Sequence, residues 1–129
     1  MNNKRDGFSL IELIVVVSIL ALMAAIAIPI FINQINQARI VTHNANIAVL
    51  ESSARLAMAA HGFPTTNVQW PDVDGTNEAG YELEKYITEW PSLPEGITYD
   101  QGFFGGSTVS YEVIINTSGT IKVSPAKET

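Results

Sequence analysis

The sequence predicts an α+β protein in which a long N-terminal helix packs on a small antiparallel sheet. Residues 13–38 contain no Asp, Glu, Lys or Arg, and residues 13–32 are almost wholly apolar. Apolar residues at helical spacing follow, at Ile47, Leu50, Ala54 and Ala57. The C-terminal part instead alternates apolar and polar residues around a turn-forming sequence, which is typical of strands. One long helix followed by short strands indicates the α+β class.

The apolar stretch is long enough to cross a membrane, because a bilayer core of about 30 Å needs about 20 apolar residues in a helix. Lys4 and Arg5 precede this stretch and Asp6 partly offsets them, so the N-terminus is expected in the cytoplasm and the rest outside. A secretory signal peptide is one interpretation, since residues 23–25 imitate a cleavage site. A plain single-pass anchor is another.

Glu12 distinguishes a third interpretation from these two. A carboxylate in an apolar helix costs about 2.5–3.5 kcal/mol at the bilayer centre on insertion scales, and less near the interface. A carboxylate at this position gives no advantage to a signal peptide or to a plain anchor that would offset its cost of insertion. An acidic residue inside a membrane segment is therefore a hypothesis of function.

The first 55 residues or so resemble a type IV pilin precursor. The short basic leader of residues 1–7 ends in Gly7-Phe8, the sequence Ser9-Leu10-Ile11-Glu12-Leu13 follows, and Pro29 lies inside the apolar helix. The resemblance implies that a prepilin peptidase cuts between Gly7 and Phe8 and methylates the new amine of Phe8. It also implies an apolar segment that stays in the membrane until the subunit assembles. Pseudopilins of type II secretion or competence systems share this motif.

After such a cut, Phe8 carries a positive amine that Glu12 of another subunit can pair with. Opposite charges attract far more strongly in a low dielectric than in water, so pairing offsets the burial of both groups. Processing would then control assembly. The alternative is that Glu12 extends to the lipid headgroups.

The helix is predicted to run from Ser9 to His61 and to stop at Gly62 and Pro64. Residues 8–32 would form the transmembrane or filament-core part, and residues 33–61 an amphipathic continuation. Pro29 removes one backbone hydrogen bond, so a break or kink is expected near it. The resemblance implies partial unwinding there in the filament.

Residues 62–129 are predicted to form a small globular head. Residues 63–79 are expected to be a loop, 81–89 a short helix, and 97–99, 109–115 and 120–123 strands, with a hairpin turn at 116–119. There is no cysteine, so no disulfide closes the C-terminal region, as it does in many pilins. A head of this size is marginal alone, and the outer half of the helix should supply much of its core.

Other candidate sites are few. Asp72, Asp74 and Glu78 could offer oxygen ligands to calcium, although their spacing does not match an EF-hand, and a solvated acidic loop is the alternative. No other cofactor or metal is expected. His43 and His61 have no evident partner and are expected at the surface or in an interface. Residues 116–118 fit a glycosylation sequon, but a turn needs the same residues.

The function expected from the resemblance is a structural filament subunit, not an enzyme. The partners would be further copies of the chain, the prepilin peptidase, an assembly ATPase and a platform protein. The location would be the bacterial cytoplasmic membrane first and an extracellular pilus later, used in adhesion, motility or DNA uptake. A net charge of −6 argues against direct binding of nucleic acid. A pseudopilin is the nearest alternative, and a membrane-anchored binding module that does not polymerise is one of another class.

Overall fold

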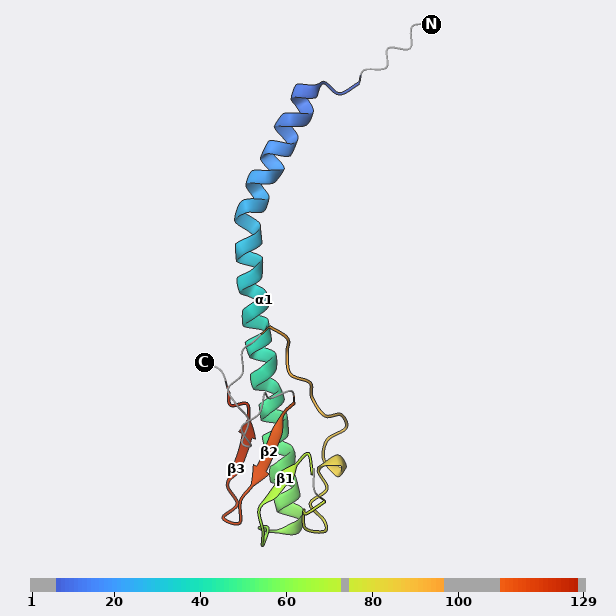
Figure 1. Ribbon diagram of the computed structural model, residues 1–129, viewed down its shortest axis with the longest axis vertical. Coiled ribbons are helices and arrows are strands. Elements are labelled where there is room, and N and C mark those ends of the chain that lie inside the picture. The colour runs from blue at the N-terminus through green and yellow to red at the C-terminus, as the bar shows by residue number, and fades with distance from the viewer. Residues whose placement is uncertain (1–6, 73–74, 97–109, 128–129) are drawn as a thin grey trace, which may run out of the picture. The chain divides into compact units, whose positions relative to one another are not determined.

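The computed structural model describes residues 7–72, 75–96 and 110–127 of the chain. Its elements are, in order, α1 (Leu10–His61), β1 (Val68–Trp70), the 3-10 helix η1 (Leu83–Lys85), β2 (Glu112–Ile115) and β3 (Ile121–Ser124) (Figure 1). The chain divides into two compact units, Met1–Gln37 and Ala38–Thr129, and α1 contributes to both. The fold class is α+β, as predicted.

Helix α1 ends where the sequence predicts. The amide of Gly62 donates to the carbonyl of Met58 at 2.8 Å, and Gly62 has a φ of +86°, which favours glycine and ends the helix. Helix α1 is uninterrupted through Pro29, and the predicted break or kink at that residue stays a prediction. Proline removes a single backbone hydrogen bond, and the helix tolerates this loss. Unwinding in a filament stays a prediction.

The sheet has the order β1-β2-β3, and both pairs are antiparallel. Trp70 is opposite Val113, which is in turn opposite Val123. Strands β2 and β3 form the predicted hairpin, in which the amide of Gly119 donates to the carbonyl of Asn116 at 2.8 Å. Both strands lie within one or a few residues of the predicted ranges.

One prediction for the head is wrong, one is confirmed in part, and one cannot be compared. Residues 63–79 were expected to be a loop but contain β1, whose three residues are a strand because they pair with β2. Residues 81–89 form only the single turn η1, since β-branched Ile87 and Thr88 and the nearby Pro91 disfavour a longer helix. The predicted strand at 97–99 lies outside the described residues.

The core of the second unit lies between α1 and the sheet. In Figure 1 the three strands lie along the C-terminal part of α1. The helix contributes Ile47, Leu50, Ala54 and Ala57, each at most 2% exposed. The sheet contributes alternate residues of one face, of which Val68, Val113 and Ile115 are fully buried, and Tyr111, the residue before β2, is fully buried as well. The half-buried Glu112 and Ile114 confirm the predicted alternation along β2.

The C-terminal segment is held against α1 by side chains. His43 is fully buried within the chain, so its predicted position at the surface or in an interface is wrong. Its Nε2 lies 2.8 Å from the carbonyl oxygen of Ala126, and Nζ of Lys127 lies 3.5 Å from a carboxylate oxygen of Glu51. These contacts hold the end of a chain that has no disulfide. His61, in contrast, is exposed, as predicted.

Candidate assembly site on the N-terminal helix

Helix α1 begins with a reciprocal pair of hydrogen bonds between Ser9 and Glu12. The amide of Ser9 donates to Oε2 of Glu12 at 2.9 Å, and the amide of Glu12 donates to Oγ of Ser9 at 3.3 Å. This is a capping box, in which two amides that lack helical partners are satisfied together. The Glu12 carboxylate is therefore held toward the N-terminal end of the helix. The Ser-x-x-Glu spacing signals this cap in the sequence, but it was not recognised there.

The peptide bond between Gly7 and Phe8 lies outside the helix. Phe8 is 95% exposed, and a Cβ atom on Gly7 would meet no atom within 4 Å. The predicted cleavage site is thus accessible in this chain, two residues before the start of α1. The Phe8 nitrogen belongs to the residue next to Ser9, whose own amide binds Glu12.

The helix surface that follows is apolar and uncovered. Every large apolar side chain from Leu10 to Ile32 is at least 49% exposed. By length and composition, α1 is the one helix among the described residues that could cross a membrane. An apolar surface of this extent is not stable in water, so lipid or other protein chains must cover it.

The candidate calcium ligands are engaged in local hydrogen bonds. Asp72 accepts the amides of Thr76 at 3.0 Å and Asn77 at 3.4 Å. Glu78 accepts the amide of Thr66 at 2.5 Å and also the hydroxyl of Thr65. Asp74 lies outside the described residues. Among the described residues no group of three or more His, Asp or Glu side chains is placed to hold a metal ion. The calcium hypothesis stays a prediction.

Comparisons with known proteins bear on the same N-terminal region. Residues 2–28 match the family model described as the prokaryotic N-terminal methylation motif. The type IV narrow pilus major component PilA5 of Thermus thermophilus is 33% identical over 78 residues, which cover 60% of this chain and 67% of that protein. The chain belongs to the type IV pilin family.

A second relative of this pilin is the fimbrial protein EcpB of Eikenella corrodens. It is 31% identical over 81 residues, which cover 63% of this chain and 49% of EcpB. The chain thus spans about half the length of that relative. No solved structure matches the chain.

The family consists of structural pilin subunits, which are not enzymes, and membership of it supports a pilus subunit. The exposed apolar surface of residues 10–32 fits both a membrane-held precursor and the interior of a filament. Gly7, Phe8 and Glu12 lie together at the start of this surface. Pro29 lies within it, and the candidate calcium ligands belong to the other unit.

Proposed function

We propose that the chain is the precursor of a type IV pilus subunit that is cut between Gly7 and Phe8, methylated on the Phe8 amine and polymerised through α1. The main support for this proposal is the first half of α1. Its surface is apolar and exposed, and Glu12 near its start is its single carboxylate. A prepilin peptidase would make the cut. An assembly ATPase and a platform protein would drive polymerisation from the membrane into an extracellular filament.

The accessibility of the Gly7–Phe8 bond supports the cleavage step. A peptidase binds its substrate in an extended form, and these two residues precede the helix and have open space around them. Glycine at position 7 also lets a protease approach the backbone closely, because it has no side chain. The cut leaves Phe8 as the new N-terminus, with a primary amine that methylation converts to a secondary amine.

The position of the Glu12 carboxylate supports the pairing step. It binds the amide of Ser9, one residue from the nitrogen that becomes the amine. A carboxylate oxygen can accept more than one hydrogen bond, so Glu12 can keep the cap and still accept the amine of a neighbouring subunit. In the uncut precursor that nitrogen is an uncharged amide, and the attraction is missing. Cleavage thereby controls assembly.

The names of the two relatives favour a pilus over a secretion pseudopilin. One is a narrow pilus component and the other a fimbrial protein. Filaments used in adhesion, motility or DNA uptake would all be built on the same helix.

The capping role and the charge role of Glu12 are separated by two substitutions. Glu12→Gln keeps an oxygen that accepts the Ser9 amide but removes the charge. Ser9→Ala removes the hydroxyl acceptor for the Glu12 amide and leaves the charge. If the charge drives assembly, Glu12→Gln subunits stay in the membrane, whereas Ser9→Ala subunits form filaments. Both are measured as the amount of protein recovered by shearing cells, with the total in the cells as reference.

Two results contradict the proposal. Glu12→Gln filaments in normal amounts would show that the charge has no role in assembly. Wild-type protein that is never recovered in filaments would favour a membrane-anchored binding module.

A further inference from the structure

We infer that the side chain of Asn77 takes the place of a further strand beside β1, and so prevents the sheet of one chain from pairing with the sheet of another. Among the described strands, the order β1-β2-β3 puts β1 and β3 at the two edges. The backbone groups on the free side of an edge strand can pair with a strand of another chain. This role of Asn77 belongs to the second compact unit alone and does not depend on filament assembly.

Asn77 makes the two hydrogen bonds that a residue of a neighbouring antiparallel strand would make. Its Oδ1 accepts the amide of Gln69 at 2.9 Å, and its Nδ2 donates to the carbonyl of Gln69 at 2.6 Å. In an antiparallel sheet, two opposite residues that exchange both bonds in this way form a hydrogen-bonded pair. The carboxamide of Asn77 therefore imitates the N–H and C=O groups of a strand residue.

This one side chain covers the outer edge of β1, the edge that faces away from β2. In an antiparallel pair, successive residues point their backbone N–H and C=O groups alternately toward the partner strand and away from it. Strand β1 has three residues, and Gln69 is the middle one. Because the Gln69 groups point to Asn77, those of Val68 and Trp70 point to β2. Asn77 thus satisfies both of the outward backbone groups of the strand.

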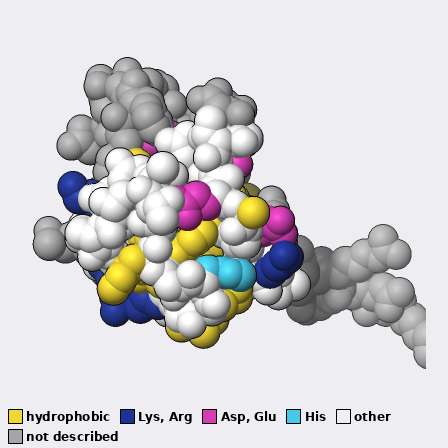
Figure 2. Space-filling view, turned by 90° about the horizontal axis from the view of Figure 1, so that it is seen from below, with side chains coloured by type: hydrophobic (Ala, Val, Ile, Leu, Met, Phe, Trp, Pro, Cys, Tyr) yellow, Lys and Arg dark blue, Asp and Glu magenta, His cyan; other side chains and the backbone are white. Residues whose placement is uncertain are grey.

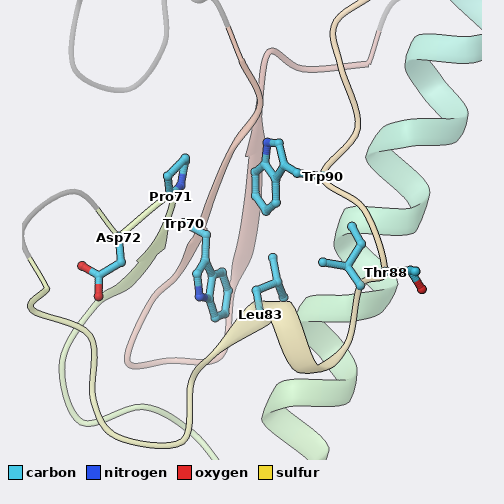
Figure 3. Close-up of a pocket in the computed structure, with 7 residues that line it drawn as sticks. Trp70, Pro71, Asp72, Leu83, Thr88 and Trp90 are labelled. Carbon is cyan, nitrogen blue, oxygen red and sulfur yellow. The ribbon is translucent and has the colours of Figure 1, made fainter.

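Two carboxylates hold the loop that carries Asn77. Asp72 accepts the amide of Thr76 at 3.0 Å and the amide of Asn77 itself at 3.4 Å. Glu78 accepts the amide of Thr66, two residues before β1, at 2.5 Å. Figure 3 shows that the Asp72 carboxylate points away from the two indole rings of the adjacent pocket. Two of the candidate calcium ligands therefore fix the position of the cap.

The two edges of the sheet are protected in different ways. Strand β3 carries the exposed Lys122, and a lysine on an edge strand opposes pairing with another chain. Charged side chains of both signs also lie beside hydrophobic ones on the face of the molecule that Figure 2 shows. The three residues of β1, in contrast, are all uncharged. At the outer edge of β1, the Asn77 cap takes the role that charge has on β3.

A single cysteine tests whether Asn77 closes this edge. The natural chain has no cysteine, so Gln69→Cys introduces one thiol. If two open β1 edges pair antiparallel about this residue, the two Cα atoms lie about 5.5 Å apart, which a disulfide can span. The full chain in detergent micelles is oxidised with copper phenanthroline, and dimers are measured on a non-reducing gel. Adding Asn77→Ala should raise the rate of dimer formation about tenfold, because the edge then has no bound carboxamide to displace.

The matched control places the cysteine away from the edge. Ser118 is exposed in the turn between β2 and β3. The Ser118→Cys chain should form dimers at the same rate with and without Asn77→Ala. An increase that appears equally with both cysteines would overturn the inference, because pairing would then not be specific to β1. An equal rate for Gln69→Cys with and without Asn77→Ala would overturn it as well.

A rescue variant separates closure of the edge from stability. Asn77→Ala removes two hydrogen bonds, so it also lowers the melting temperature of the head. Adding Gln69→Lys puts like charges directly opposite each other in the paired edges, which disfavours pairing. In sedimentation velocity runs of the full chain in detergent, Asn77→Ala should associate more than wild type. Asn77→Ala with Gln69→Lys should sediment as wild type while its melting temperature stays low.

Association of Asn77→Ala that Gln69→Lys does not reverse would overturn the inference, because loss of stability alone would then cause it. The proposed function is tested separately by recovery of filaments from cells. A chain that forms no filaments but shows the expected dimers in detergent would contradict the proposed function and leave the role of Asn77 in place.

Discussion

Nδ1 of His43 lies 2.8 Å from the hydroxyl of Tyr111, and the two rings stack with centroids 5.6 Å apart. The carbonyl of Ala126, 2.8 Å from Nε2, can only accept, so Nε2 carries the proton and Nδ1 accepts the tyrosine hydroxyl. Burial raises the pKa of Tyr111 and keeps that hydroxyl protonated. One buried histidine thus connects α1, the residue before β2 and the C-terminal segment.

Replacing His43 should destabilise the head. His43→Phe keeps a ring of similar shape but leaves the Tyr111 hydroxyl and the Ala126 carbonyl without this partner, which costs about 1–3 kcal/mol. Urea unfolding of a fragment of residues 38–129 measures the change. His61→Phe is the matched control, because His61 is exposed and bonds the Tyr86 hydroxyl at 3.1 Å, and it should cost less. Equal effects of the two substitutions would contradict the role given to His43.

The head should not fold without its part of α1. Four helix residues (Ile47, Leu50, Ala54 and Ala57) form one side of the core. A fragment that begins at Gly62 lacks them and would leave Val113 and Ile115 facing water. A fragment of residues 38–129 should melt cooperatively when followed by circular dichroism, whereas one of residues 62–129 should not. A cooperative melt of the shorter fragment would refute this prediction.

Glu78 should make the head sensitive to acid. The hydroxyl of Thr65, followed by the amide and hydroxyl of Thr66, lowers the pKa of Glu78 below its ordinary value. A carboxylate whose pKa is lower in the folded state stabilises that state above the unfolded pKa, about 4.3 for Glu, and this stabilisation is lost as the pH falls through the folded pKa. The melting temperature of Glu78→Gln should therefore be lower than that of wild type at pH 7, and the difference should shrink below pH 4. A difference independent of pH would show that the charge of Glu78 is not involved.

Local signals in the sequence were enough to predict α1 and the β2–β3 hairpin. The stop at Gly62 and the turn at residues 116–119 depend on backbone preferences that individual residue types carry. Strand β1 was missed because its three residues, Val68–Trp70, are surrounded by turn-forming residues and are a strand only through pairing with β2. The side chain of Asn77 also binds the backbone amide and carbonyl of Gln69, at 2.9 and 2.6 Å, on the edge of this strand. Such long-range contacts leave no periodic pattern.

The residues of the candidate site could be predicted from the sequence, but their hydrogen bonds could not. Gly7, Phe8 and Glu12 follow from a motif, but the hydrogen bonds that hold the Glu12 carboxylate toward Phe8 became evident only from the backbone geometry. His43 was misplaced because polar residues are more often exposed, and its partners are 68 and 83 residues away in the chain. The sequence alone cannot show that such distant groups meet.

The mass and N-terminal sequence of protein sheared from the cell surface test the central claim most directly. A processed pilus subunit is expected to begin at Phe8, to carry one methyl group on its amine and to be recovered in filaments. Protein that begins at Met1 and stays in the membrane fraction would contradict both the cleavage and the assembly. A chain that begins near Ala25 would contradict them as well, because an ordinary signal peptide would then have been removed together with Glu12.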